Sequence, residues 1–418
     1  MLLIAAPGQG AQAPGFLREW LDVPGFAGRI GAWSELAGCD LIRCGTTADA
    51  DEIRDTAVAQ PLLVAAAIAA AAELFALPGQ PGAGQAAPLA DAAVAAGTDA
   101  AAGHSVGELA AGAIAGTLAP DDAIRLVRVR GEAMARAAAA EATGMTAVLG
   151  GDEAEVLAAI EAHGLAPANV NGSGQIVAAG TTGQLAAFAA DRPPRARLRP
   201  LSVAGAFHTE HMAPAVAALR EAAATVAIGR PVLTLLSDRD GSVVHSGPDW
   251  LERIVTQVSA PVRWDRCMQT MISLNVSALI ELPPAGTLTG LARRAMPDVE
   301  SFKLNNPGDL DAARALLAAH GTGPGRAEAD GTHPDSHAPD WRLLVAPLSG
   351  TFRAGATGGA GPGAAVSTGA ELGHVEMRGG RQAVSSAFPA TIIEWLVEDG
   401  DPVTAGQPLV RLQPEASD

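Results

Sequence analysis

Short apolar segments alternate with longer segments of helical composition over the first 320 residues. Leu2–Ala5 has the composition of a buried strand that ends at Pro7-Gly8, and Thr56–Ala76 has that of a helix. Strands that alternate with helices favour a parallel sheet covered by helices, so the pattern predicts an α/β fold. Further strands are expected at residues 99–102, 232–236, 278–282 and around Phe302.

Between residues 140 and 203 the segments become shorter and their order changes. Extended and helical segments follow one another as β-α-β-β-α-β, which is the order of a ferredoxin-like subdomain. We therefore expect a small subdomain inserted into the larger sheet. The expected strands are Thr146–Leu149, Asn169–Asn171, Gln175–Ala179 and Leu198–Val203, and the expected helices are Asp152–His163 and Gln184–Ala190.

Two stretches rich in proline and glycine interrupt this pattern. Pro78–Pro88 is expected to be a loop. Residues 321–340 have too little apolar content to order themselves, so we expect a linker there and a further domain over residues 341–418. His333 and His337 lie four residues apart in the linker. Loop histidines without a scaffold are more often solvated than bound to a metal, and no metal site is expected.

Charge and hydropathy exclude several classes of protein. A net charge of -17 disfavours binding to nucleic acid or to an anionic membrane. The most apolar run, Leu62–Ala72, is shorter than the ~20 residues that cross a bilayer, so a buried helix is expected. No secretion signal is visible at the start of the chain. Cys39, Cys44 and Cys267 lack metal-binding spacing and are expected to be reduced thiols of a cytoplasmic protein.

The pentapeptide 103–107, Gly-His-Ser-Val-Gly, fits the G-x-S-x-G pattern in which a strand turns sharply into a helix and exposes a serine hydroxyl. Ser105 is therefore the candidate nucleophile. The start of a helix favours negative charge, so the Val106 amide is placed to stabilise the oxyanion of a tetrahedral intermediate. On the pentapeptide alone, a glycine-bounded helix start without any chemistry explains the pattern too.

Five further segments accompany this pentapeptide: Gly8–Gln12, Arg130–Met134, Asn169–Gly180, Gly205–Thr209 and Gln257–Trp264. In this order they resemble the motifs of malonyl-CoA:acyl carrier protein transacylases, and the resemblance covers about the first 320 residues. Six spaced motifs in one order are far more specific than any single one.

The resemblance implies an acyl transfer in two steps. Ser105 attacks the thioester of malonyl-CoA, coenzyme A leaves, and the phosphopantetheine thiol of holo acyl carrier protein takes the malonyl group. His208 is implied as the general base and acid, because an imidazole with a pKa near ~6.5 can accept a hydroxyl proton. Gln257 matches the position whose main-chain carbonyl orients this histidine. Coenzyme A and phosphopantetheine enter as parts of the substrates, and no tightly bound cofactor is expected.

Three more residues match positions around the substrate. The backbone amide of Gln9 is implied as the second oxyanion donor. Arg130 is implied to bind the free carboxylate of the malonyl group, a task suited to a planar guanidinium. Phe207 resembles the phenylalanine of malonyl-selective members, whose ring excludes an α-methyl branch, a discrimination of about 1–3 kcal/mol. Without the resemblance, Arg125, Arg128 and Arg130 fit a solvated helix face.

The densest basic run of the chain lies at the end of the expected small subdomain. Acyl carrier proteins are acidic, so docking onto a chain of charge -17 requires a local positive patch. An ordinary solvated edge explains the run equally well. Its members are Arg192, Arg195, Arg197 and Arg199.

From Trp341 onward the chain resembles biotinyl and lipoyl carrier domains, which are small β-barrels. The hairpin that carries the modified lysine in those domains reads Glu376–Arg381 here, with Gly379 at the lysine position. Residues 304–418 contain no lysine, so an amide link to biotin or lipoate is impossible there. A stabilising appendage and a docking or dimerising module both stay open. The matching segments are Ala346–Phe352, Ala365–Glu376 and Thr391–Leu412.

The expected molecule is thus an α/β-hydrolase-like acyltransferase with a ferredoxin-like insert and a C-terminal lipoyl-like β-barrel, acting in fatty acid biosynthesis. A thioester hydrolase would use the same serine and base with water as the acceptor, but it has less need of Arg130. A trans-acting acyltransferase of a polyketide synthase differs only in its acceptor. A scaffold that binds biotin-dependent carboxylases through the barrel is the non-enzymatic alternative.

Overall fold

A computed structural model of the protein describes residues 1–75, 86–203, 205–322, 342–355, 363–377, 380–386, 388–397, 399–404 and 407–414. The chain divides into two compact units, Met1–Ala329 and Asp330–Asp418. Each unit has hydrophobic clusters of its own.

The first unit is built on a six-stranded sheet with the order β10-β9-β1-β2-β7-β8. All neighbours in this sheet pair in parallel except β7 and β8, which are antiparallel. The expected α/β fold is therefore observed, although β7 begins two residues later than predicted. The strands are β1 (Leu2–Ala6), β2 (Ala100–Gly103), β7 (Thr234–Leu236), β8 (Val243–Val244), β9 (Ala278–Glu281) and β10 (Glu300–Lys303).

Alternate residues of β1 face opposite sides of the sheet, as the two-residue period of a strand requires. Leu2 and Ile4 belong to a large cluster with residues of α3, α5 and α6. Leu3 and Ala5 belong to a smaller cluster with residues of α11 and α12. Helices therefore cover both faces of the sheet, which explains why its central strands β1 and β2 are apolar and fully buried.

The described helices of the first unit differ from expectation at two places. No helix was predicted over α1 and α2, and Gly25, Gly28 and Gly31 weaken the helical propensity of α1. Of the expected loop Pro78–Pro88, residues 78–85 lie outside the described residues. Residues 86–88 form the start of α4. The helices are α1 (Pro24–Ala37), α2 (Leu41–Thr46), α3 (Thr56–Leu74), α4 (Ala86–Ala95), α5 (Gly107–Ile114), α6 (Pro120–Ala139), α9 (Ala213–Ala223), α10 (Gly247–Gln257), α11 (Trp264–Ser273), α12 (Thr287–Ala295) and α13 (Leu310–His320).

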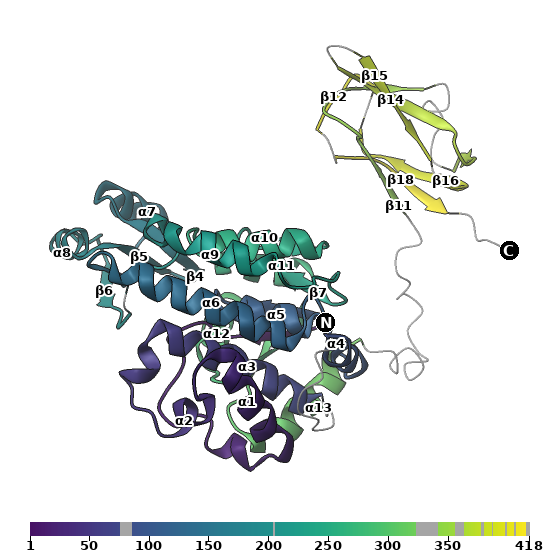
Figure 1. The fold of residues 1–418 in the computed structure, drawn as a ribbon. Helices are drawn as coiled ribbons and strands as arrows, with labels where there is room; N and C mark the ends of the chain where they lie inside the picture. The colour runs from purple at the N-terminus through teal and green to yellow at the C-terminus, as the bar shows by residue number, and fades with distance from the viewer. Residues whose placement is uncertain are drawn as a thin grey trace. The chain divides into compact units, whose positions relative to one another are not determined.

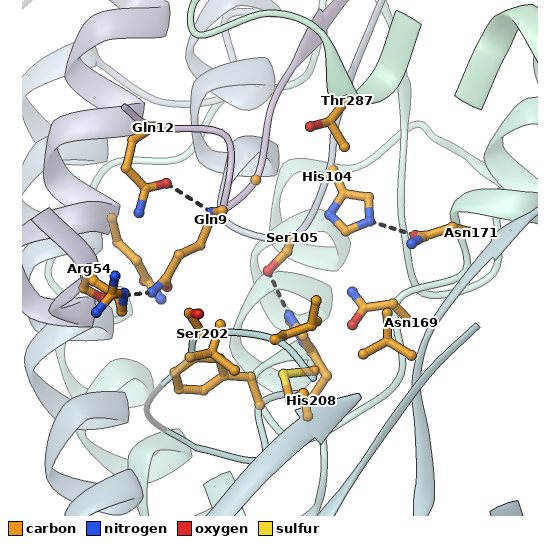
Figure 2. Close-up of a pocket in the computed structure, with 18 of the residues that line it drawn as sticks. Gln9, Gln12, Arg54, His104, Ser105, Asn169, Asn171, Ser202, His208 and Thr287 are labelled. Atoms are coloured by element: carbon orange, nitrogen blue, oxygen red, sulfur yellow. Dashed lines mark hydrogen bonds between the residues drawn. The ribbon is translucent and has the colours of Figure 1, made fainter. Parts of the chain in front are cut away.

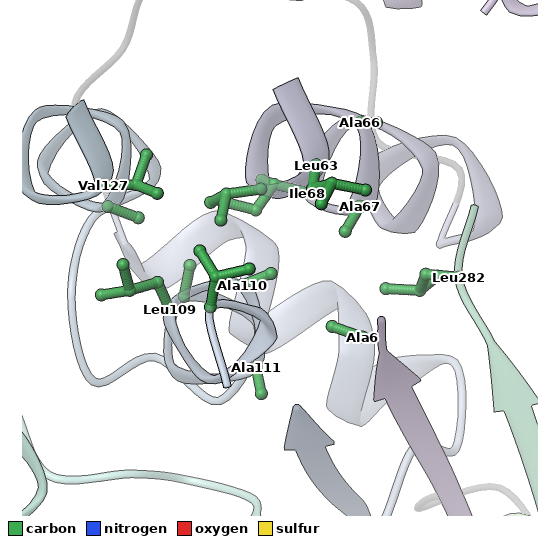
Figure 3. Close-up of a cluster of buried hydrophobic side chains, with 14 of the residues drawn as sticks. Ala6, Leu63, Ala66, Ala67, Ile68, Leu109, Ala110, Ala111, Val127 and Leu282 are labelled. Carbon is green, nitrogen blue, oxygen red and sulfur yellow. The ribbon is translucent and has the colours of Figure 1, made fainter. Parts of the chain in front are cut away.

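Helix α3 lies in the larger cluster, where it packs against α5 and α6 (Figures 1 and 3). In the described part of the chain it is the one helix with the length and hydropathy to cross a membrane, but 83% of its most apolar window is buried inside the protein. The buried helix expected over Leu62–Ala72 is thus confirmed. Small alanine side chains such as Ala67 and Ala110 lie in this cluster together with the larger Leu63 and Leu109 (Figure 3).

The small subdomain follows α6 and has the expected β-α-β-β-α-β order. Its four strands form one antiparallel sheet with the order β4-β5-β3-β6. The main correction concerns β6, which begins two residues before the expected strand and ends before Leu201. The elements are β3 (Thr143–Gly150), α7 (Glu153–Ala162), β4 (Ala166–Gly172), β5 (Gln175–Thr181), α8 (Thr182–Ala190) and β6 (Ala196–Pro200).

The second unit is a β domain of two four-stranded antiparallel sheets, with the orders β11-β18-β16-β13 and β15-β14-β12-β17. Leu344 and Trp395 pack against both hydrophobic clusters of this domain, and each cluster contains residues from both sheets. In the hairpin of β14 and β15, Met377 pairs with Gly380, and the expected lysine position between them lies outside the described residues. The strands are β11 (Arg342–Val345), β12 (Gly350–Ala354), β13 (Ala365–Val366), β14 (Glu371–Met377), β15 (Gly380–Ser385), β16 (Ala390–Trp395), β17 (Pro402–Val403) and β18 (Pro408–Pro414).

Candidate active site

A cavity of about 410 Å³ opens at the carboxyl ends of β1 and β2, between the main sheet and the small subdomain (Figure 2). This edge of a parallel sheet is where α/β folds usually bind ligands. Among the described lining residues there is no Asp or Glu, and Arg54 is the only Lys or Arg. The cavity is therefore suited to an anionic or neutral ligand.

Ser105 stands at the turn from β2 into α5, with a backbone φ of 53°. A side chain in this left-handed region is strained, so the surrounding packing must hold it there. A Cβ on Gly103 would lie 2.1 Å from the carbonyl of Gly107, and one on Gly107 would lie 2.3 Å from the carbonyl oxygen of Ala6. Both glycines of the pentapeptide are thus required sterically, and the turn presents the serine hydroxyl to the cavity.

The structure brings Ser105 and His208 together, although they are 103 residues apart in the sequence. Ser105 Oγ lies 2.7 Å from Nε2 of His208, and Nδ1 of the same ring lies 2.9 Å from the main-chain oxygen of Gln257. A carbonyl oxygen only accepts hydrogen bonds, so Nδ1 carries the proton and donates it. Nε2 is left as the acceptor for the serine proton, which is the arrangement that a general base needs.

The pKa of His208 is lowered from 6.5 to about 3, first by burial and then by the positive charge of Arg130. The imidazole is therefore neutral at physiological pH and ready to accept a proton. Its side chain is 4% exposed. His208 itself has a backbone φ of 61°, so both residues of the pair are held in strained conformations.

Arg130 extends from α6 to the same hydroxyl and is 1% exposed. Its Nη2 donates to Ser105 Oγ at 3.2 Å and to Gln257 Oε1 at 3.4 Å, and its Nη1 donates to Gln60 Oε1 at 2.7 Å. These partners are all neutral, so no described carboxylate pairs with the guanidinium directly. Burial lowers the pKa of Arg130 to about 10, and the group remains charged at neutral pH. A buried cation beside a nucleophile can bind an anionic substrate group.

The three arginines of this helix therefore differ. Arg130 belongs to the site, whereas Arg125 forms an ion pair with Asp122 and Arg128 one with Glu132 on the helix surface.

The two expected oxyanion donors follow the carboxyl ends of the neighbouring parallel strands β1 and β2. Gln9 follows β1, and Val106 follows the nucleophile at the start of α5. Within the described residues, neither backbone amide donates a hydrogen bond to the protein. The side chain of Gln9 is fixed by hydrogen bonds to Thr56 Oγ1 (3.2 Å) and to the carbonyl of Arg54 (3.4 Å), as Figure 2 shows for Gln9 and Arg54. Both amides are therefore uncommitted within the described residues.

Phe207 lines the cavity and is 5% exposed, so its ring limits the space beside the nucleophile.

His104 precedes the nucleophile and connects the turn between β2 and α5 to the small subdomain. Its Nε2 lies 2.9 Å from Asn171 Oδ1 (Figure 2). Sequence analysis placed His104 and Asn171 inside motifs but assigned no role to either of them.

Three buried polar residues of the site were not expected. Gln60 binds Arg130, and Glu108 and Asp238 lie under the nucleophile. For Gln60, the sequence offered one signal, which is a polar residue beside the apolar run 62–72. Glu108 and Asp238 meet only through the fold, 130 residues apart. Among the described residues, no group of three or more His, Cys, Asp or Glu side chains is arranged to hold a metal ion.

A histidine-activated serine, two free amides for an oxyanion and a buried arginine define a serine acyltransferase. Residues 6–306 match the family model of the acyl transferase domain, and the chain belongs to this family and groups there with the malonyl CoA-acyl carrier protein transacylases. The match ends before the second unit begins.

The relatives agree with this assignment. The malonyl CoA-acyl carrier protein transacylase of Mycobacterium tuberculosis is 51% identical over 312 residues, which are 74% of this chain and 98% of the relative. The Escherichia coli K12 enzyme of the same name is 30% identical over 317 residues, which are 74% of this chain and 97% of the relative.

Solved structures agree as well. The crystal structure of MCAT from M. tuberculosis has 50% sequence identity and a TM-score of 0.69, and it covers 75% of this chain and 99% of its own. A malonyl-transacylase in complex with a type II PKS acyl-carrier protein has 26% identity and a TM-score of 0.67, with 75% of this chain and 99% of its own covered.

Proposed function

We propose that the protein transfers the malonyl group of malonyl-CoA to the phosphopantetheine thiol of holo acyl carrier protein, for fatty acid biosynthesis. The observation that carries this proposal is the environment of one oxygen. Ser105 Oγ contacts the base His208 and the cation Arg130 at the same time. A nucleophile in contact with a buried cation is suited to an acyl group that carries its own negative charge.

In the first step, Ser105 Oγ attacks the thioester carbonyl while its proton passes to Nε2 of His208. The amides of Gln9 and Val106 stabilise the oxyanion. The carbon–sulfur bond breaks, the coenzyme A thiolate takes the proton from His208, and malonyl-Ser105 remains. The bound malonyl carboxylate offsets the charge of Arg130, which removes one of the causes that lower the pKa of His208. Substrate binding thereby makes the base stronger.

In the second step, the phosphopantetheine thiol gives its proton to His208 and attacks the malonyl carbonyl. The bond to Ser105 Oγ breaks, and the serine regains a proton from His208. Coenzyme A and phosphopantetheine act as substrates, so the proposed chemistry uses no metal and no tightly bound cofactor. We place this reaction in the cytoplasm.

Selection for malonyl groups is assigned to Arg130 and Phe207. Arg130 binds the free carboxylate through its Nη2, which now contacts only the neutral oxygens of Ser105 and Gln257. Phe207 lies beside the base and excludes a methyl branch at the α-carbon. Gln257 orients the base through its main-chain oxygen.

The carrier protein is proposed to dock on the basic edge strand β6. Arg192, Arg195, Arg197 and Arg199 are exposed, and none of them forms an ion pair within the described residues. The chain continues from β6 into Leu201–Val203, which line the cavity. An acidic carrier protein on this strand would therefore stand next to the cavity entrance.

For the second unit we propose a biotinyl/lipoyl-like domain without a prosthetic group. Its two antiparallel sheets and the β14–β15 hairpin support the likeness, and the absence of lysine after Lys303 excludes amide attachment. Its purpose is proposed to be stabilising or docking. Intact mass measurement of the purified protein tests this point, because bound biotin or lipoate would add mass to the second unit.

One alternative acceptor has a specific observation in its favour. The likeness to the malonyl-transacylase bound to a polyketide acyl-carrier protein favours a polyketide carrier as a second candidate. Water as the acceptor is disfavoured, since a hydrolase has less need of Arg130. Loading rates measured with fatty acid and polyketide carrier proteins separate the first two acceptors.

The function is tested by incubating the wild type and Ser105→Ala with radiolabelled malonyl-CoA. We expect label on the wild type alone and its transfer to holo acyl carrier protein. Release of free malonate without transfer would indicate a hydrolase. Label on Ser105→Ala would contradict the assignment of the nucleophile.

A further inference from the structure

Two glutamine side chains hold the guanidinium of Arg130 at its buried end. Nη1 donates to Gln60 Oε1 at 2.7 Å, and Nη2 donates to Gln257 Oε1 at 3.4 Å. Gln60 is 1% exposed and Gln257 is 3% exposed. A buried charge is normally paired with an opposite charge. Within the described part of the chain, neutral oxygens take that place around Arg130, so direct contacts leave its charge uncompensated.

The contact with Gln60 depends on the close approach of α3 and α6. A Cβ on Gly131 would lie 2.9 Å from the carbonyl oxygen of Thr56, so a glycine beside Arg130 allows the two helices to come this near. Gln60 lies one turn after Thr56 on α3, and Arg130 directly precedes Gly131 on α6. The packing of the two helices therefore brings the amide and the guanidinium together.

The orientation of the Gln60 amide follows from its two neighbours. A guanidinium only donates hydrogen bonds, so the oxygen of the amide must face Arg130. The NH₂ group donates to the sulfur of Met134 at 3.4 Å, and a thioether is a weak acceptor. Met134 lies one turn after Arg130 on the same helix. Residue 60 thus presents a neutral acceptor to the arginine.

An amide also separates Arg130 from the carboxyl groups buried nearby. Nε2 of Gln257 donates to Glu108 and to Asp238, while Oε1 of the same amide accepts from Arg130. The arginine therefore meets amide oxygens at both of its terminal nitrogens. An amide oxygen accepts a hydrogen bond without forming an ion pair, so the guanidinium stays available for an anionic group of a substrate.

Gln60 also lines the cavity, together with Met134, Ser105 and His208. A carboxylate that reaches Arg130 from the cavity therefore has Gln60 as its neighbour. The side chains of glutamine and glutamate have the same shape. Residue 60 is thus a position at which a carboxylate of the protein could replace the carboxylate of a substrate.

We propose that Gln60 is a positioning residue for malonyl selection: its neutral oxygen holds Arg130 in place and leaves the charge of the guanidinium to the substrate carboxylate. This inference rests on the proposed function, in which Arg130 binds the malonyl carboxylate. It goes further by assigning to residue 60, acting through Arg130, the choice between a charged and an uncharged acyl group.

The test is the preference for malonyl-CoA over acetyl-CoA, measured as the ratio of kcat/KM values for acylation of the full chain. In Gln60→Glu the new carboxylate pairs with Arg130 inside the protein and repels the malonyl carboxylate. We expect this ratio to fall by about 10- to 100-fold, the effect of one lost charge-assisted hydrogen bond. Acylation by acetyl-CoA should persist, because Ser105 and His208 keep their contact. A merely structural defect lowers both rates together and leaves the ratio unchanged.

A second variant separates the hydrogen bond from the charge. Gln60→Met keeps the length of the side chain and removes the acceptor, so Arg130 loses the shorter of its two amide contacts. The ratio should fall by about three- to tenfold, less than in Gln60→Glu, because the charge of Arg130 stays free.

The matched control is Gln175→Glu, which adds the same charge to the lining of the same cavity. Gln175 lies on β5 of the small subdomain and accepts a hydrogen bond from Arg294. Both thioesters carry the same coenzyme A, so this change should leave the ratio within about threefold of the wild type. A fall equal to that of Gln60→Glu would indicate a general repulsion of anions and would overturn the inference.

An unchanged ratio in either Gln60 variant also overturns the inference, as does the loss of acylation by both thioesters in a folded Gln60→Glu. If Gln60→Glu does not fold, Gln60→Met decides alone. A wild type without any preference for malonyl-CoA would overturn the proposed substrate. A wild-type preference that survives in both Gln60 variants would overturn only the role of Gln60.

Discussion

Arg130 and His208 contact the same hydroxyl oxygen, that of Ser105, at 3.2 Å and 2.7 Å. The cation that we propose to bind the substrate and the proposed general base are therefore coupled electrostatically beside the hydroxyl that they share. Each additional positive charge near a buried imidazole makes its protonated form less stable. The pH dependence of the reaction thus reports on Arg130 as well as on His208.

The coupling predicts the acid side of the pH profile. His208 must be neutral to accept the serine proton, and its pKa is lowered to about 3. A lowered pKa keeps the imidazole neutral at lower pH, so wild-type acylation by acetyl-CoA should not decline between pH ~7 and ~5. In Arg130→Met one cause of the lowered pKa is removed, and the decline should begin at higher pH. Single-turnover acylation across this range measures both profiles. Identical profiles in wild type and variant would contradict the coupling.

Gly107→Ala should destabilise the fold, because its new Cβ would lie 2.3 Å from the carbonyl oxygen of Ala6. We expect a loss of about 1–3 kcal/mol in the free energy of unfolding, as for other overpacked sites. Gly28→Ala in α1 meets no atom within 4 Å and should gain about 1 kcal/mol from helix propensity. Urea denaturation of both variants measures the difference. If Gly107→Ala and Gly28→Ala were equally stable, the turn around Ser105 would tolerate a side chain at residue 107.

Phe207→Ala should admit a branched acyl group. Removal of the ring opens space beside Ser105, and the preference for malonyl-CoA over methylmalonyl-CoA should fall by about 10- to 100-fold. Competition between the two thioesters measures this change. Phe302→Ala, on β10 and away from the cavity lining, is the matched control and should keep the wild-type preference.

Charge reversal on β6 tests the docking of the carrier protein. In Arg197→Glu/Arg199→Glu we expect kcat/KM for holo acyl carrier protein to fall about tenfold at low salt, because the positive patch guides an acidic partner. Acylation by malonyl-CoA should be unchanged, since neither arginine lines the cavity. Arg230→Glu reverses an exposed charge elsewhere and serves as the control. A normal rate with the carrier protein in the β6 variant would reject this surface.

A chain shortened to residues 1–322 should keep its malonyl transfer activity. The first unit has its own hydrophobic core, and the M. tuberculosis relative matches over 98% of its length without the second unit. Loading of the carrier protein by the shortened and full chains measures the contribution of the second unit. Loss of activity in a shortened chain that is still folded would assign the β domain a part in the reaction.

Local sequence signals pointed to Ser105 and His208, but not to the buried polar residues packed around them. Ser105 is visible in the sequence because the two glycines around it are sterically required, and His208 because it lies in a recognisable motif. Gln60, Glu108 and Asp238 have no such local mark, since their role arises when α3, α5 and the end of β7 converge on one place. A single sequence gives residue types along the chain, whereas this convergence depends on tertiary packing.

The same limit explains the missed first helix. Gly25, Gly28 and Gly31 reduce the intrinsic preference of α1 for helix, but Phe26, Ile30 and Trp33 bury their side chains in the core and outweigh that cost. The parallel sheet was easier to predict, because a central buried strand such as β1 is apolar over its whole length.

The alanine-rich contact between α3 and α5 has a consequence for how this enzyme can evolve. Alanine has no rotamers to lose, so these positions add no side-chain entropy cost to the packing of the two helices. They are correspondingly intolerant of growth, because a larger side chain has to displace closely packed neighbours. Since α5 begins two residues after Ser105, a bulkier residue at Ala67 or Ala110 would shift the turn that holds this serine. Inherited variation at these inconspicuous positions should therefore be selected against through activity and not only through stability.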